Sequence, residues 1–280
     1  MLIHRILTAL ILIPMVIIAL FFAPLSIFSY LVIAVCGIAA WEWTNFLAMT
    51  KPLHKIVFTF SVVMLLSLVY LIPNTELIKY RLFNYIICFS IIWWLVAFLL
   101  VIGYPKSVKY WSNSLIIKLL FAFFTLFPFF VGMIELRSIN YIFNTYTGAV
   151  WLLYVFVLVW ATDTGAYFVG RAIGKRKLAA KVSPGKTIEG FLGGISSAIL
   201  ISVFVYLTGY FQISFITFIL SSLLAILVSV LGDLTESMFK REAGIKDSGN
   251  IIPGHGGILD RIDSLTAAVP IFAALSLHLL

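Results

Sequence analysis

Nine long runs of apolar residues, separated by short stretches that carry charge, proline or glycine, dominate this sequence. Each run is about 17 to 23 residues long, and a helix of roughly 20 residues crosses a hydrocarbon core of about 30 Å. The chain is 62% hydrophobic and 11% charged, whereas soluble domains carry about a quarter charged residues. We therefore predict an all-α, polytopic integral membrane protein with about nine transmembrane helices. The predicted spans are 6–23, 25–47, 56–72, 85–102, 116–134, 148–170, 188–209, 213–232 and 264–280.

The Lys and Arg residues divide unevenly between the two sides of the predicted membrane. With a cytoplasmic N-terminus, 16 of the 19 fall in cytoplasmic segments, and Lys79, Arg81 and Arg137 fall outside. This split satisfies the positive-inside rule, so we predict that the N-terminus is cytoplasmic. The net charge of +8 follows from this topology, and nucleic-acid binding is not needed to explain it.

Acidic residues concentrate late in the chain, although topology does not require them and hydrocarbon penalises them. Eight of the eleven lie at or after Asp163. We expect a single membrane domain over residues 1–280, in which 1–147 supplies scaffold helices and 148–280 supplies catalytic helices and cytoplasmic loops. Glu42, Glu76 and Glu135, in the first part, are interpreted as scaffold or lipid-facing residues.

The first candidate motif runs from Asp163 to Arg171 at the cytoplasmic end of the sixth predicted span. A carboxylate so close to hydrocarbon calls for a partner or a purpose. Gly165 and Gly170 would allow a second helix or a ligand to approach the backbone closely. The alternative is an interfacial aspartate that caps the helix or pairs with Arg171.

The second candidate motif runs from Ser183 to Gly190 and enters the seventh predicted span. It contains Gly-Lys-Thr, but Ala180 stands where the first glycine of a P-loop belongs, so that interpretation fails. We expect a turn before a helix N-terminus, where free N–H groups and Lys186 would bind an anionic substrate. The alternative is a positive-inside loop with a helix cap.

The third candidate motif extends from Gly232 to Asp263. Asp233 and Glu236 are three residues apart, as are Asp260 and Asp263, so on a helix each pair would share one face. Paired carboxylates at a membrane surface suit Mg²⁺, which takes oxygen ligands from one or two carboxylates and from substrate phosphates. A glycine turn at 255–257 would offer N–H groups to an oxyanion. The alternative is a set of salt bridges that joins two helix ends.

The same motif resembles the signature of the phosphatidate cytidylyltransferase (CDP-diglyceride synthase) family. The resemblance covers the 27 residues from Ser237 to Asp263 without a departure in spacing or residue type, and the first two motifs look like that family as well. The matching positions are Ser237, Lys240, Arg241, Lys246, Asp247, Gly249, Pro253, His255, Gly256, Gly257, Asp260, Arg261 and Asp263.

The resemblance implies that the phosphate of phosphatidic acid attacks the α-phosphorus of CTP, which yields CDP-diacylglycerol and pyrophosphate in phospholipid biosynthesis. It also implies Mg²⁺, leaves a second cation open, suggests a homodimer, and places the protein in the bacterial cytoplasmic (inner) membrane with its active site facing the cytoplasm. Because phosphate is already an anion near neutral pH, no strong base is needed, and His255 is interpreted as a hydrogen-bond donor or turn residue.

On this resemblance we assign three sets of site residues. The catalytic residues are Asp233, Asp260, Asp263, Lys240 and Arg241. The metal ligands are Asp233, Asp260, Asp263 and Asp163. The substrate-binding residues are Ser183, Lys186, Ser237, Lys246, Asp247, His255, Gly256, Gly257 and Arg261.

Three other protein classes fit the sequence less well. A secondary transporter would carry charges near the membrane midplane and matched helix breaks in two halves, and neither is evident. A CDP-alcohol phosphatidyltransferase would carry a D-G-x-x-A-R motif, which is absent. A purely structural assembly protein would not need so many polar residues in its cytoplasmic motifs.

Overall fold

Each apolar run of the sequence forms a helix in the computed structural model of the chain, which describes residues 2–73, 77–252 and 256–279. Eight of the helices within these ranges are long and apolar enough to cross a membrane, and α1 contributes a shorter apolar stretch, Leu10–Phe22. The prediction of an all-α polytopic membrane protein is confirmed. The elements are α1 Leu2–Phe22, α2 Leu25–Trp43, α3 Pro52–Leu71, α4 Leu77–Ile102, α5 Val108–Trp111, α6 Leu115–Ser138, α7 Thr145–Ile173, β1 Lys177–Ala179, β2 Ser183–Thr187, α8 Ile188–Leu207, α9 Phe215–Glu242, α10 Leu259–Ala273 and the π-helix η1 Ala274–Leu279.

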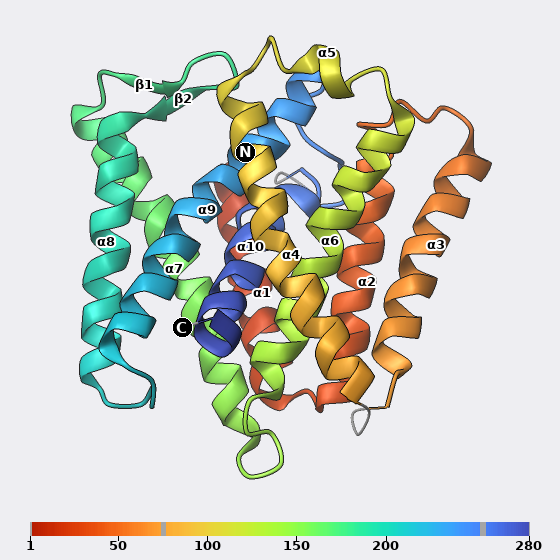
Figure 1. The fold of residues 1–280 in the computed structure, drawn as a ribbon. Helices are drawn as coiled ribbons and strands as arrows, with labels where there is room; N and C mark the ends of the chain where they lie inside the picture. The colour runs from red at the N-terminus through yellow and green to blue at the C-terminus, as the bar shows by residue number, and fades with distance from the viewer. Residues whose placement is uncertain (1, 74–76, 253–255, 280) are drawn as a thin grey trace.

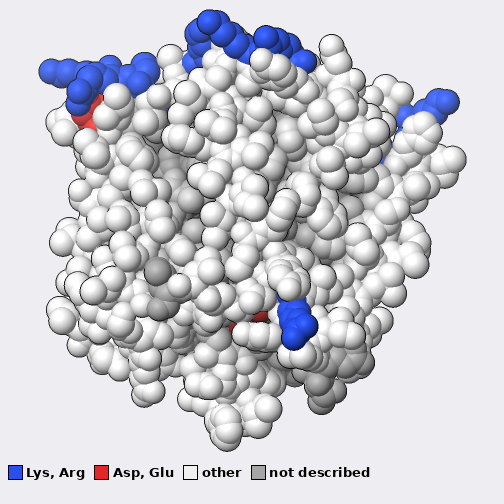
Figure 2. All heavy atoms as spheres, in the orientation of Figure 1, with Lys and Arg blue, Asp and Glu red and all other residues white. Residues whose placement is uncertain are grey.

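Successive long helices run in alternating directions, so their connections fall at two ends of the bundle (Figure 1). One end carries α5, the β1–β2 hairpin and the C-terminal end of α9, and we call it the basic end. Figure 2 shows Lys and Arg side chains along this upper rim, over the hairpin and over α5. The opposite end carries the α6–α7 and α8–α9 connections.

Helix α9 continues well past its predicted span of 213–232. It has 28 residues, or about 42 Å at 1.5 Å per residue, which exceeds a hydrocarbon core of about 30 Å. Its last turns stay helical because Leu234, Met238 and Phe239 recur at helical spacing and are at most 8% exposed. The acidic and basic residues of the third motif therefore begin on a rigid helix.

The β1–β2 hairpin was not predicted from the sequence. Its strands pair antiparallel, with Lys177 opposite Thr187 and Ala179 opposite Ser183. Strand β1 lies in a segment that was predicted to be a basic loop, and β2 lies in a segment that was predicted to be a turn. Short polar strands show no alternation of apolar and polar residues, so their pairing leaves no periodic signal. Lys186 is therefore on a strand, and α8 begins only after Thr187.

Aromatic residues from the N-terminal half pack against the end of α9. The Phe239 ring lies 5.3 Å from that of Trp43 on α2 and 5.0 Å from that of Trp111 on α5. Trp43, Trp93, Trp94 and Trp111 are at most 4% exposed, whereas Trp41 is 40% exposed. The four buried tryptophans belong to the core, and two of them, Trp43 and Trp111, hold the end of α9 through Phe239.

Candidate active site

Close backbone packing brings the motif-bearing elements together at the basic end. Helices α7 and α8 pack along each other, as do α9 and α10. A Cβ on Gly194 of α8 would lie 2.5 Å from the Thr162 carbonyl oxygen of α7, and one on Gly232 of α9 would lie 2.5 Å from the Asp263 carbonyl oxygen of α10. These approaches require glycine, so the spacing of the carboxylates depends on them.

Three aspartates from three helices form one group, which we call the carboxylate group: Asp163 on α7, Asp233 on α9 and Asp263 on α10. Asp233 lies within electrostatic reach of each of the other two. Its Oδ2 is 2.6 Å from Lys186 Nζ on β2, and its Oδ1 accepts a hydrogen bond of 3.2 Å from the Ser237 hydroxyl. All three aspartates reach the accessible surface. Fixed carboxylates and a cation are thus available to a charged substrate.

Asp260 was predicted to bind metal together with these aspartates, but it has different partners. Its Oδ1 is 2.7 Å from Lys240 Nζ, which also lies 2.9 Å from Glu236 Oε2. Its Oδ2 accepts hydrogen bonds from the Ser248 N–H at 2.9 Å, the Ser248 hydroxyl at 3.0 Å and the Gly257 N–H at 2.8 Å. Both carboxylate oxygens are occupied, so Asp260 ties the loop before α10 to α9. We call Glu236, Lys240 and Asp260 the Lys240 cluster.

Glu42 contributes to this region from the N-terminal half of the chain. Its carboxylate accepts hydrogen bonds from the N–H groups of Ile258 and Leu259, at 3.0 and 2.7 Å, and shares the single hydrogen of the Ser248 hydroxyl, 3.2 Å away, with Asp260. Glu42 is 1% exposed, so it does not face lipid, and that part of the expectation is wrong. The signal that could have found it is a carboxylate inside an apolar run, which usually has a specific partner.

The turn before α10 differs from its sequence prediction. His255 lies outside the described residues. The N–H of Gly257 is bound by Asp260, and the next two N–H groups are bound by Glu42. Of the N–H groups that were expected to serve an oxyanion, that of Gly257 is thus taken, and the expectation is wrong for this group.

The cations of the motifs occupy several positions at the basic end. Arg241, at the end of α9, donates from Nε to the Val182 carbonyl at 3.2 Å and so contacts the hairpin. Arg261 on α10 lies within electrostatic reach of Asp163. Lys246 and Asp247 are exposed in the loop after α9, Ser183 is half-buried on β2, and Gly256 adopts a φ of +82°.

Of the structural alternatives stated for the first two motifs, the helix cap of the second is present, whereas the described contacts do not pair Asp163 with Arg171. Arg171 donates to the Tyr167 hydroxyl at 3.0 Å, so this arginine has a partner other than Asp163. Thr187 caps α8 by accepting from the Gly190 N–H at 3.1 Å, and Glu189 binds Arg176 at 2.9 Å. The helix start is therefore capped by its own side chain, while Lys186 points to Asp233.

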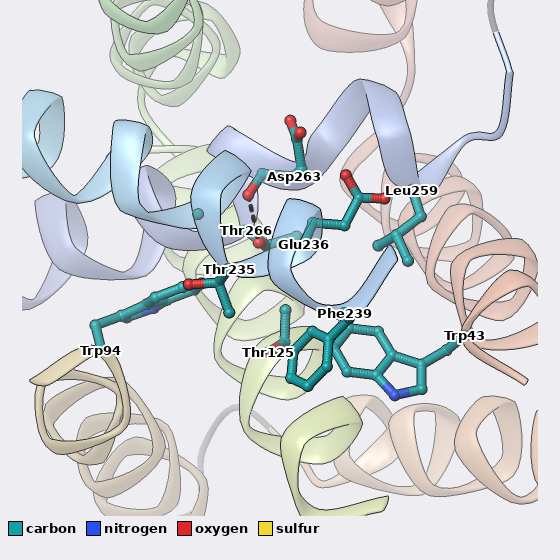
Figure 3. Close-up of a pocket in the computed structure, with 10 residues that line it drawn as sticks. Trp43, Trp94, Thr125, Thr235, Glu236, Phe239, Leu259, Asp263 and Thr266 are labelled. Carbon is teal, nitrogen blue, oxygen red and sulfur yellow. Dashed lines mark hydrogen bonds between the residues drawn. The ribbon is translucent and has the colours of Figure 1, made fainter. Parts of the chain in front are cut away.

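A small cavity lies between the carboxylates and the aromatic core (Figure 3). Glu236 and Asp263 lie on one side of it, and the rings of Trp43, Trp94 and Phe239 lie on the other. The Glu236 Oε1 atom is buried and accepts no hydrogen bond from a donor in the described chain, and the Asp263 carboxyl group lies within hydrogen-bonding reach of Glu236. A buried carboxylate oxygen without a donor is costly, so this atom fits a cation or a donor in the site.

Comparison with known proteins connects this geometry to one family. The family model for the cytidylyltransferase family matches residues 3–279. The chain is similar to a phosphatidate cytidylyltransferase of Haemophilus influenzae, with 46% identity over 98% of each chain. It is also similar to a phosphatidate cytidylyltransferase of Pseudomonas aeruginosa, with 40% identity over 98% of this chain and 97% of the relative. The similarity thus covers the N-terminal helices as well as the motifs.

Proposed function

The chain belongs to the cytidylyltransferase family, and we propose that the carboxylate group and the cations around it are where it acts on CTP and phosphatidate. The reaction is that of a phosphatidate cytidylyltransferase. An oxygen of the phosphatidate phosphate forms a bond to the α-phosphorus of CTP, and the bond from that phosphorus to the β-phosphate oxygen breaks. The products are CDP-diacylglycerol, a precursor in phospholipid biosynthesis, and pyrophosphate.

The observation that carries the assignment of the site is the convergence of the carboxylate group with Lys186. These residues come from α7, α9, α10 and β2 and meet only at the basic end. Both substrates are multiply charged anions, so their approach requires fixed cations that offset the repulsion. Lys186, Arg241 and Arg261 would hold phosphate oxygens and align the nucleophile opposite the pyrophosphate. The phosphate nucleophile is already ionised, so the chain need not supply a strong base.

The donor atoms of the site fit Mg²⁺. Among the described residues, no three His, Cys, Asp or Glu side chains converge as a complete ligand set. Mg²⁺ needs only one or two protein carboxylates when substrate phosphates and water supply its other ligands. The proposed ligands are Asp233 and Asp263, with Asp163 close by, and the Glu236 Oε1 atom, which has no donor in the described chain, is compatible with a nearby cation. When bound, Mg²⁺ would supply charge neutralisation for the triphosphate.

Asp260 is a weaker candidate for a metal ligand than its sequence position implied. Its two oxygens already accept four hydrogen bonds, including one from Lys240. This supports a role in holding the loop and α10 in place. The proposed metal site is therefore centred on the carboxylate group, and a second cation remains a prediction from the family resemblance.

We also propose that the basic end faces the cytoplasm of a bacterial inner membrane. The uneven division of Lys and Arg supports this orientation through the positive-inside rule. CTP would then arrive from the cytoplasm, while phosphatidate would arrive laterally through the bilayer. A homodimer that binds no nucleic acid is proposed from the resemblance and the charge distribution alone.

The direct test is transfer of radiolabelled CTP into lipid by purified protein with phosphatidic acid and Mg²⁺. We expect a lipid-linked cytidine product that requires phosphatidic acid, together with equimolar pyrophosphate. A protein that is monodisperse and folded but forms no lipid-linked cytidine would contradict the proposal. Omission of phosphatidic acid is the control for carry-over of free nucleotide.

A further inference from the structure

We propose that Glu42 is a positioning residue for the transfer reaction. It belongs to α2, in the half of the chain that carries none of the sequence motifs, and it does not need to touch substrate. Its carboxylate would hold the first turn of α10 in the orientation that directs Asp263 into the carboxylate group. The inference rests on the proposed function and gives the N-terminal helices a part in it.

Within the described chain, the hydrogen bonds of the Glu42 side chain go to the α9–α10 loop and to the first turn of α10. Its Oε1 accepts from the Ile258 N–H, and its Oε2 accepts from the Leu259 N–H and the Ser248 hydroxyl. The free N–H groups of a helix start carry a partial positive charge, so a buried carboxylate there is favoured both by hydrogen bonds and by the helix dipole. Among the described residues, the helix start at Ile258 has no side-chain cap of its own, and Glu42 supplies this cap from α2.

Two glycines of the third motif make room for this carboxylate. A Cβ on Gly249 would have Glu42 atoms as its three nearest neighbours, with Oε1 too close to be accommodated. A Cβ on Gly257 would lie 2.5 Å from Glu42 Oε2 and would also collide with the Ser248 hydroxyl. These two glycines are thus explained by a residue more than 200 positions away.

The same end of α2 holds the loop and α9 as well. Asn45 Nδ2 donates to the Ser248 carbonyl at 2.8 Å, and Lys55 Nζ donates to Asn45 Oδ1 at 3.0 Å. Trp43, next to Glu42, packs on Phe239 of α9. The end of α2 therefore contacts both helices that carry Asp233 and Asp263, and the Glu42 carboxylate is its link to α10.

Displacement of the first turn of α10 moves Asp263, which lies one turn after Leu259. It does not directly move Lys186, which is held on the β1–β2 hairpin and paired with Asp233. Loss of the Glu42 contacts should therefore lower kcat much more than it weakens CTP binding. Removal of a group that orients ligating residues typically costs about 10- to 100-fold in activity.

The test compares Glu42→Gln with Glu42→Asp in the lipid-transfer assay. Both oxygens of Glu42 accept from N–H groups, so the amide nitrogen of Gln would face a donor and break one contact. We expect Glu42→Gln to lower kcat about 10- to 100-fold while KM for CTP changes less than about 3-fold, and Glu42→Asp to recover part of kcat. Glu135→Gln is the matched control, because Glu135 is a second intramembrane carboxylate that binds His278 at the far end of α6. It should keep the wild-type kcat.

A second variant perturbs the carboxylate without removing it. Gly249→Ala pushes directly on Glu42, so we expect the same selective fall in kcat. In a Glu42→Ala background, the carboxylate that the added methyl would meet is gone, so the methyl should cost little further activity. If Glu42→Gln cannot be purified folded, Gly249→Ala decides the question.

The outcomes separate this inference from the proposed function. Wild-type protein that makes no CDP-lipid contradicts the proposed function itself. Active wild-type protein with an unchanged kcat in Glu42→Gln or in Gly249→Ala overturns the positioning role alone. A loss that appears equally in Glu135→Gln, or that only follows a lower folded fraction, also overturns it.

Discussion

Lys240 is the cation on which two buried carboxylates depend, and its replacement by Met tests the Lys240 cluster. Met has nearly the length and volume of Lys, so the variant removes the charge and leaves the packing. The side chains of Glu236 and Asp260 are only 4% and 5% exposed, and both lose their shared partner. Removal of one member of a buried ion pair costs about 3 to 5 kcal/mol, because a charge is left without compensation.

The assay is thermal unfolding of the purified protein in detergent, followed by tryptophan fluorescence. With roughly 2 to 4 °C per kcal/mol for a chain of this size class, Lys240→Met should lower the midpoint by about 6 to 20 °C. The double variant Lys240→Met/Glu236→Met also removes one carboxylate, and a buried pair replaced by apolar side chains is often neutral in stability. It should recover at least half of the loss. A Lys240→Met protein as stable as wild type, or a double variant less stable than the single one, would refute the reasoning.

Two further predictions concern the substrate contacts and the orientation. Lys186→Met should lower kcat/KM for CTP about 100-fold. It should lower the unfolding midpoint less than Lys240→Met does, because Lys186 and Asp233 are 25% and 29% exposed and a more accessible pair contributes less to stability than a buried one. A stability loss like that of Lys240→Met would contradict this. The orientation can be tested in intact cells with a membrane-impermeant maleimide. The reagent should label Ile142→Cys, since Ile142 lies in the α6–α7 connection and is 93% exposed, and it should not label Lys246→Cys at the basic end. The opposite labelling pattern would contradict the proposed topology.

The helices could be predicted from the sequence because a long apolar run has one dominant solution in a bilayer. A helix satisfies its own backbone polar groups, so local composition suffices. Alternation of the spans then placed Asp163, Lys186 and Asp233 at one end without any knowledge of their contacts. The structure confirms that these side chains are neighbours.

The remaining features depend on contacts between distant residues. Glu42 and Ile258 are 216 positions apart, and nothing in the local sequence of either indicates the other. Asp260 and Asp263 look equivalent as a pair three residues apart, yet the loop before α10 folds back onto Asp260 and leaves Asp263 to the carboxylate group. Residue type and spacing predicted which groups take part, but not how the two aspartates divide their partners.

The most direct test of the central claim is the transfer of labelled CTP into lipid by Asp263→Asn, measured beside wild type and Glu135→Gln. The account predicts that wild type and Glu135→Gln form lipid-linked cytidine at comparable rates. It predicts that Asp263→Asn, folded and with an unchanged unfolding profile in detergent, loses at least about 100-fold in kcat, because a charged oxygen ligand has been replaced at the reacting phosphates. Full activity in Asp263→Asn would contradict the claim that the carboxylate group is the site of transfer.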